Sequence, residues 1–155
     1  MSPEKSHFVC AVIWRKAQSI NGIKAYEFLV IDSVSTDRVG RKSNRHVKFP
    51  GGMNRVREES VELTLQREVL EETHLALLPD MATELCRIQS GPDHTKYGFL
   101  VRFDDCRGRL RSESLHDNGD EMSEPRWVPA DVLGRELFEK HQPFFMEACR
   151  RLGIF

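Results

Sequence analysis

Residues 49–75 decide the fold of this chain and read FPGGMNRVREESVELTLQREVLEETHL. Within this segment, residues 60–73 lack glycine and proline and are dense in Glu, Leu, Gln and Arg, which are good helix formers. Ser60 is suited to cap the N-terminus of such a helix, and Glu58 and Glu59 place negative charge where the helix dipole favours it. We therefore predict a helix over residues 60–73.

Three carboxylates lie on one side of this predicted helix. Glu68, Glu71 and Glu72 stand at i, i+3 and i+4, so they fall within an arc of about 100°. Apolar residues flank that arc on both sides and are expected to be covered: Val61, Leu65 and Val69 on one, Leu63 and Leu70 on the other. Like charges at this spacing oppose helix formation by roughly 0.2–0.5 kcal/mol per pair. A solvated acidic face is one explanation, and a bound hard cation such as Mg²⁺, which prefers carboxylate oxygens, is the other.

The turn ahead of the helix is the second informative feature. Pro50-Gly51-Gly52 follows a short strand expected over residues 45–49, and we expect the tripeptide to end that strand without continuing into a regular element. Glycine lets a ligand or metal approach the backbone closely, although a Pro-Gly-Gly turn is common on its own. Arg67 is placed to reach back to Glu59 and to fix the helix against this entry loop.

The elements around this segment set the fold class. Residues 7–15 and 25–34 are rich in β-formers and are separated by Asn21-Gly22, which indicates a hairpin or two neighbouring strands. Later elements are expected in chain order: strands at 83–89 and 96–103, a long polar loop at 104–123, a strand at 126–128, and helices at 129–133 and 142–152. This pattern predicts an α/β (α+β) fold in which helices sandwich a mixed sheet.

The composition limits the classes of function. With 24 acidic and 23 basic residues the net charge is -1, so no global field points to nucleic acid or to an anionic membrane. The four cysteines show no C-x-x-C spacing and the six histidines no zinc-ligand spacing, which favours reduced thiols and no structural zinc. No stretch approaches the ~20 apolar residues of a membrane span. We expect a cytoplasmic protein with a single domain over residues 1–155.

The spacing of these residues resembles a known family. Gly52, Glu59 and the run Arg67-Glu68-Val69-Leu70-Glu71-Glu72-Thr73-His74-Leu75 are similar to the Nudix box, G-x5-E-x7-R-E-U-x-E-E-x-G-U, in which U is a bulky apolar residue. The chain departs from this pattern twice. Residues 53–58 make the first loop one residue longer, and His74 replaces the glycine that ends the helix in a left-handed conformation. Neither departure removes an acidic residue.

The resemblance implies a fold and a mechanism. It implies a Nudix-like αβα sandwich and a Mg²⁺-dependent pyrophosphohydrolase, with Mn²⁺ as an alternative metal, that cleaves a nucleoside diphosphate linked to a group X. It assigns the metal to Glu68, Glu71 and Glu72 with the Gly51 carbonyl, and assigns Arg67 and Glu59 as the orienting pair. A box glutamate, Glu68 or Glu72, is favoured as the general base. Two later residues stay open as base or metal ligand: Glu121 and Glu124.

The substrate is less constrained than the chemistry. Arg45, Lys48, Gly52 and Tyr97 are the candidate substrate-binding residues, although a solvated strand face explains the basic residues equally well and core packing explains Tyr97. We expect a small nucleotide or nucleotide-sugar type of substrate and no membrane partner. A homodimer, a nucleic-acid 5′-end pyrophosphohydrolase and a non-catalytic Nudix-fold nucleotide-binding regulator stay open as alternatives.

Overall fold

The computed structural model describes residues 6–17, 25–117 and 119–154 of the 155-residue chain. The predicted Asn21-Gly22 turn lies outside these residues. Within them, nine strands form one mixed sheet. These strands are β1 (Ser6–Ala17), β2 (Ala25–Ser35), β3 (His46–Lys48), β4 (Gly51–Met53), β6 (Ala82–Gln89), β7 (His94–Arg102), β9 (Leu115–Asp117), β10 (Asp120–Met122) and β11 (Arg126–Pro129).

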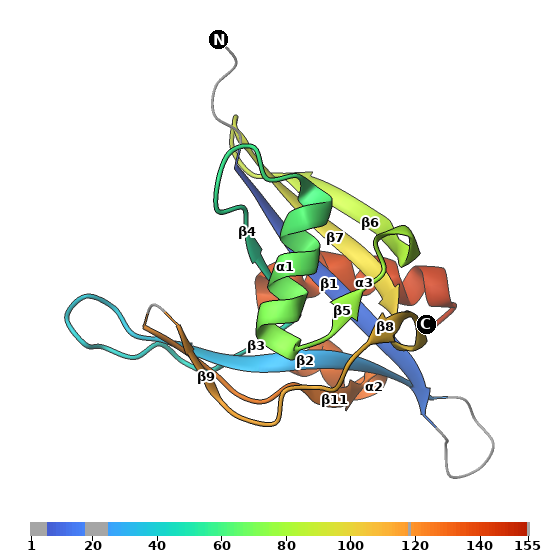
Figure 1. The fold of residues 1–155 in the computed structure, drawn as a ribbon. Helices are drawn as coiled ribbons and strands as arrows, with labels where there is room; N and C mark the ends of the chain where they lie inside the picture. The colour runs from blue at the N-terminus through green and yellow to red at the C-terminus, as the bar shows by residue number, and fades with distance from the viewer. Residues whose placement is uncertain (1–5, 18–24, 118, 155) are drawn as a thin grey trace.

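Helices cover both faces of the sheet, as Figure 1 shows, with α1 on one face and α2 and α3 on the other. The remaining elements are α1 (Val61–Thr73), α2 (Ala130–Glu136), α3 (Gln142–Leu152), the 3-10 turns η1 (Pro79–Met81), η2 (Phe103–Asp105) and η3 (Glu139–His141), and the strand pair β5 (Ala76–Leu77) and β8 (Cys106–Arg107). This arrangement confirms the predicted mixed α/β architecture. None of the helices in the described ranges combines the length and apolar character needed to span a bilayer.

The central strand β1 has different neighbours at its two ends. It pairs in parallel with β7 from Ser6–His94 to Trp14–Arg102, but it pairs with β2 only near its C-terminal end, from Trp14–Phe28 to Ala17–Ala25. Toward the other end β1 and β2 diverge, and Figure 1 shows the opening between them. The short strand β4 adds to β1 there, and β3 adds to β2. This splay opens the sheet beside the C-terminal half of α1.

Alternate residues of β1 enter two separate cores, as the period of a strand requires. Val9, Ala11 and Ile13 pack against Leu65 and Val69 of α1. Cys10 and Val12 face the opposite side and pack with buried residues of β2, α2 and α3, among them Phe28, Leu133, Phe144 and Phe145. Both cores use the same central strand, so the position of α1 is fixed relative to the residues on the other face of the sheet.

Both ends of α1 form as the sequence predicts. The Ser60 side chain accepts a hydrogen bond from the Leu63 amide at 3.2 Å, which caps the N-terminus. At the C-terminus His74 adopts φ 67° and ψ 12°, the left-handed conformation in which glycine is usual. Its amide donates to the Leu70 carbonyl at 3.0 Å. The histidine therefore takes over the helix-ending conformation of the box glycine.

Three local predictions differ from the structure. Gly51 and Gly52 continue into strand β4, because their lack of side chains lets them lie against β1. The expected loop 104–123 contains the short strands β8, β9 and β10, which extend the sheets at their edges. Leu63 and Leu70 are 56% and 51% exposed, so only one of the two apolar flanks of the carboxylates is covered.

Candidate active site

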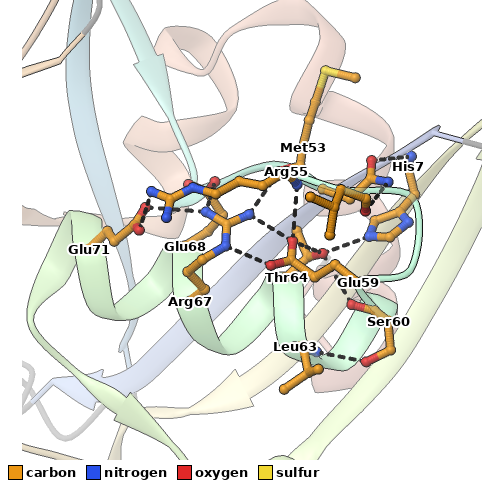
Figure 2. Close-up of polar contacts among 12 residues, drawn as sticks. His7, Met53, Arg55, Glu59, Ser60, Leu63, Thr64, Arg67, Glu68 and Glu71 are labelled. Atoms are coloured by element: carbon orange, nitrogen blue, oxygen red, sulfur yellow. Dashed lines mark hydrogen bonds and ion pairs between the residues drawn. The ribbon is translucent and has the colours of Figure 1, made fainter.

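An arginine–glutamate pair fixes α1 against the loop that precedes it. Arg67 Nε donates to Glu59 Oε2 at 2.9 Å and Arg67 Nη2 donates to Glu59 Oε1 at 2.8 Å, as Figure 2 shows. The guanidinium lowers the pKa of Glu59 to about 2, and the Glu59 carboxylate raises the pKa of Arg67. Arg67 Nη2 also donates to the Met53 carbonyl at 2.9 Å. The two residues predicted to orient the helix are thus in direct contact.

Two buried polar side chains extend this pair toward β1. Thr64 Oγ1 lies 2.7 Å from Glu59 Oε1 and 2.7 Å from His7 Nε2. Burial lowers the pKa of His7, so its ring is neutral near pH 7. A hydroxyl has one proton, so Thr64 donates to Glu59 when it accepts from His7. We call Arg67, Glu59, Thr64 and His7 the brace, because together they tie the entry loop, α1 and β1.

Glu71 is more exposed than Glu68 and Glu72 and forms ion pairs with two arginines. Arg55 Nη2 donates to Glu71 Oε1 at 2.5 Å, and Arg67 Nη1 lies 3.3 Å from Glu71 Oε2 (Figure 2). The Glu71 side chain is 36% exposed, whereas the Glu68 side chain is 14% exposed. Two arginines therefore neutralise Glu71 at the surface, which a helical arc alone does not reveal.

Glu68 and Glu72 form the buried part of the acidic arc, and we call them the carboxyl pair. Glu72 is 8% exposed, and burial, the charge of Glu68 and a hydrogen bond with Glu68 raise its pKa well above the ordinary value. The Gly51 amide donates to Glu72 Oε1 at 3.2 Å, and Arg67 Nη1 donates to Glu68 Oε1 at 2.8 Å. Two acidic side chains are thus close together with little access to water, where a nearby positive charge would stabilise their charged forms.

The two glycines of β4 are required by two different close approaches. A Cβ on Gly51 would lie 2.0 Å from the Val9 carbonyl oxygen of β1. A Cβ on Gly52 would lie 2.4 Å from the Glu68 carboxyl carbon. The first glycine therefore lets β4 pack against β1, and the second leaves room for the Glu68 carboxylate above the backbone.

The carboxyl pair suits a divalent cation in its donor chemistry. Two largely buried carboxyl groups this close together would be stabilised as carboxylates by a hard cation bound between them. Across the residues that the structure describes, no group of three or more His, Cys, Asp or Glu side chains is arranged to hold a metal. Glu68 and Glu72 are thus the two predicted ligands that the fold brings together. The roles of Glu71 and of the Gly51 carbonyl as ligands stay predictions.

A pocket of about 380 Å³ opens beside the carboxyl pair, where β1 and β2 diverge. Glu72, Gly51 and Gly52 line one part of it. Its other walls combine aromatic, basic and acidic side chains: Phe8, Phe49, Phe138 and His141; Lys48, Lys96 and Lys140; and Asp120. The pocket lies on the face of the sheet that α2 and α3 cover, and it reaches through the opening to the end of α1.

The structure brings only some of the predicted substrate-binding residues to this pocket. Lys48 and Gly52 line it. Arg45 is exposed outside it, one residue before β3. Tyr97 lies on the α1 face of β7, where its ring contacts His7 edge-on at 6.3 Å and stacks with Phe99 at 6.5 Å. Tyr97 therefore packs against the core on the α1 side of the sheet. Its neighbour Lys96 points to the opposite face of the strand and lines the pocket.

The two late glutamates lie outside the pocket as well. Glu121 is an exposed residue of β10, and its neighbours Asp120 and Met122 have the side chains that line the pocket. Glu124 is exposed and acts electrostatically on Arg111. Strand alternation makes Asp120 the acidic residue of this segment that faces the pocket, and the roles of Glu121 and Glu124 stay predictions.

Arg111 is a buried residue near the carboxyl pair that no sequence pattern indicates. It is 5% exposed and donates from Nε to the Glu72 carbonyl at 2.8 Å and from Nη2 to the Ser123 carbonyl at 2.9 Å. Its amide donates to the Thr73 carbonyl at 2.9 Å. Arg111 therefore ties the end of α1 to the segment that leads into β11, and it fixes the backbone that carries Glu72.

Comparisons with known proteins agree with this geometry. The NUDIX domain family model matches residues 20–149. No curated protein sequence matches the chain. Among solved structures, a mutT/nudix family protein from Listeria innocua superposes with a TM-score of 0.68 at 18% identity, covering 99% of this chain and 96% of that chain.

Two further solved structures share the fold. A MutT NUDIX hydrolase from Burkholderia pseudomallei has a TM-score of 0.63 at 20% identity, with 92% of this chain and 97% of that chain covered. An Ap4A hydrolase from C. elegans has a TM-score of 0.54 at 17% identity, with 96% of this chain and 98% of that chain covered. At these identities the structures support the fold, and the family assignment depends on the match over residues 20–149. The chain therefore belongs to the Nudix family and is a hydrolase acting on phosphoric anhydride bonds.

Proposed function

We propose that this protein is a Mg²⁺-dependent pyrophosphohydrolase that cleaves the diphosphate linkage of a nucleoside diphosphate joined to another group X. The carboxyl pair carries this proposal: Glu68 and Glu72 lie close together in a largely buried position that adjoins a pocket. Family membership supports nucleoside diphosphate derivatives in general as substrates. The pocket, at about 380 Å³, is of the size that small-molecule ligands occupy and so favours a nucleotide-type compound.

Glu68 and Glu72 would hold the metal, with Glu71 joining them if it leaves Arg55. Bound there, Mg²⁺, or Mn²⁺ in its place, would neutralise the phosphate oxygens and lower the pKa of an attacking water. A carboxylate oxygen of Glu68 or Glu72 that does not contact the metal would accept the proton of that water. Both carboxylates are held by donors of this chain, from Arg67 and from the Gly51 amide.

The brace and Arg111 act on the carboxyl pair indirectly. Arg67 donates to Glu59 and to Glu68 at the same time, so it fixes the direction of the Glu68 carboxylate. Arg111 fixes the Glu72 backbone through the Glu72 carbonyl. We regard both as positioning residues, because neither needs to touch the substrate to influence the reaction.

The proposal is tested by a substrate-panel assay in which product mass identifies the cleaved bond. Purified protein is incubated with nucleoside diphosphate sugars, dinucleotides and nucleoside triphosphates in Mg²⁺, in Mn²⁺ and in EDTA. We expect metal-dependent cleavage of a P–O–P bond, and we expect Glu72→Gln to reduce turnover by orders of magnitude with an unchanged melting temperature. Glu62→Gln, an exposed position on the same helix, is the matched control and should retain activity.

Two results would contradict the proposal. One is inactivity on every diphosphate with both metals. The other is near wild-type turnover of the Glu72→Gln protein, because the carboxylate proposed to hold the metal or accept the proton would then be dispensable.

A further inference from the structure

The charges of the pocket are not balanced within the chain. Lys48, Lys96 and Lys140 line it, and none of them forms an ion pair with a carboxylate of the described residues. Lys48 and Lys96 are half-buried. Partial burial of an ammonium group is unfavourable unless a counter-charge compensates it. The ammonium groups of these lysines are therefore available to an anionic ligand in the pocket.

Two of the lysines occupy different positions relative to the carboxyl pair. Lys48 belongs to β3, which pairs with β2, and its charge lowers the pKa of His141. Its ammonium is 5.3 Å from the centre of the Phe138 ring. Lys96 also lowers the pKa of His141, and it comes from β7 on the far side of β1. Lys48 precedes Gly51, whose amide donates to Glu72, by three residues and so stands at the carboxyl-pair end of the pocket, whereas Lys96 stands on the β7 side of β1.

His141 adds a second, independent donor to that part of the pocket. It is 5% exposed, and its Nδ1 accepts a hydrogen bond from the Phe49 amide at 3.1 Å. Burial, assisted by Lys48 and Lys96, lowers the pKa of His141 to about 3, so the ring is neutral and carries its proton on Nε2. Within the described ranges no group accepts a hydrogen bond from Nε2. A buried donor without an acceptor lines the pocket beside the lysines.

Asp120 is the acidic residue of the pocket other than Glu72, and the topology places it away from Lys96. Asp120 pairs with Ser35 of β2, whereas Lys96 pairs with Phe8 of β1. These two strands are the diverging walls of the opening. Asp120 and Lys96 thus stand on opposite sides of it, and Asp120 does not neutralise the lysine.

We propose that the pocket binds a phosphate group of the substrate additional to the diphosphate that is cleaved, with Lys96, Lys140 and the His141 Nε2–H as its donors. This inference rests on the proposed function for the position of the scissile diphosphate at the carboxyl pair. Lys48 then serves the scissile diphosphate and the remaining donors serve the second phosphate. The preferred substrates carry a phosphomonoester on the nucleoside or a longer phosphate chain, and their counterparts without the extra phosphate are poorer.

Binding of matched ligands tests the inference independently of catalysis. Titration calorimetry compares adenosine 3′,5′-bisphosphate with AMP, in Mg²⁺ and in EDTA, for the wild type, Lys96→Gln, Lys140→Gln and the double variant. We expect the bisphosphate to bind about tenfold more tightly than AMP, as charge-assisted hydrogen bonds to one additional phosphate allow. The double variant should bring this ratio close to one. Lys16→Gln, an exposed lysine of β1 outside the pocket, removes the same charge and should preserve the ratio.

Turnover of matched pairs identifies the source of the second phosphate. NADPH against NADH and coenzyme A against dephospho-coenzyme A differ by one phosphomonoester, whereas diadenosine tetraphosphate against diadenosine diphosphate differs in chain length. A preference in the first two pairs assigns a phosphomonoester, and a preference in the last pair assigns a longer chain. In either case kcat/KM of the phosphorylated member should fall about tenfold in the Lys96→Gln/Lys140→Gln protein, and that of its partner should not.

The outcomes separate this inference from the proposed function. Equal binding and equal turnover within every pair would overturn the inference and leave the hydrolase intact. Equal losses for both members of each pair in the lysine variants would also overturn it, because the lysines would then hold the scissile diphosphate. Failure to cleave any compound would overturn the proposed function, while a retained preference for the bisphosphate in calorimetry would still support the phosphate site.

Discussion

The brace and the pocket are both rich in charge, but they differ in where their counter-charges come from. In the brace, Arg67 meets Glu59 at 2.8 and 2.9 Å, and Thr64 links Glu59 to His7. In the pocket, Lys48 and Lys96 have aromatic and histidine neighbours, and neither forms an ion pair with a carboxylate of the described residues. Charges that the chain satisfies itself support the fold, whereas charges that it leaves unsatisfied mark the surface where an anionic ligand completes the structure.

The largest effect is expected where the two regions meet, at the glycines of β4. Gly51→Ala would drive a Cβ into the Val9 carbonyl, a backbone atom that cannot move aside, so we expect a loss of about 3–4 kcal/mol in the free energy of unfolding. Gly52→Ala meets the movable end of Glu68, so it should change stability far less but reduce turnover at least about tenfold. Urea denaturation and kcat measurements on both variants distinguish the two roles. Equal losses of stability would contradict this division.

The second largest effect is expected from removing the charge of Arg67, the central residue of the brace. Arg67→Ala leaves Glu59 and Glu68 without their main partner, so we expect about 2–3 kcal/mol less stability together with lower turnover. Arg87→Ala is the matched control, because Arg87 makes the same two-point contact with Glu84 at the surface and should have no measurable effect. A variant of Arg67 as stable as the Arg87 control would show that the brace does not support the fold.

The smallest of the three effects concerns the pocket and depends on pH. Because the pKa of His141 is lowered to about 3 in the folded protein from 6.5 when unfolded, the unfolded state binds more protons between these values. Stability should therefore fall as pH drops below 6.5, and His141 accounts for about 2 kcal/mol of that loss at pH 5. The His141→Asn protein keeps an acceptor for the Phe49 amide. Between pH 7.5 and pH 5 it should lose about 2 kcal/mol less stability than the wild type.

A matched control uses a histidine of the surface. His116 is exposed, so His116→Asn should keep the wild-type slope of stability against pH. Parallel slopes for wild type and His141→Asn would mean that His141 is not held neutral by burial and the lysines.

The parts of the site that depend on local spacing could be read from the sequence. Helix α1, its Ser60 cap and the contact between Glu59 and Arg67 all lie within one short segment, so helical geometry determines them. Even there the surroundings of Glu71 could not be predicted, because this carboxylate is bound by Arg55 of the entry loop at the surface. Helical periodicity places a side chain on a face, but it does not identify the neighbour that the side chain contacts.

The pocket depends on contacts between distant segments, and there the sequence predicts little. Lys96 and Asp120 come from strands on opposite sides of the opening, and the register of each strand decides whether a residue or its neighbour faces inward. The predicted residues Tyr97 and Glu121 are each the sequence neighbour of a residue that lines the pocket, Lys96 and Asp120. No sequence pattern identifies Arg111, because its side chain donates to backbone carbonyls, those of Glu72, Glu113 and Ser123, which any residue type provides.

The parallel pairing of β1 with β7 has a consequence for how the chain folds. Ser6 and His94 stand side by side in this ladder although 88 positions separate them in sequence. During synthesis β1 is made before the other elements described here, and β7, with which it forms its longest ladder, follows only after α1 and β6 have been made. Pairing across such a separation is slow, and β1 keeps an unpaired edge until it is complete. We therefore expect nascent chains that end before residue 94 to be prone to aggregation and to depend on chaperones.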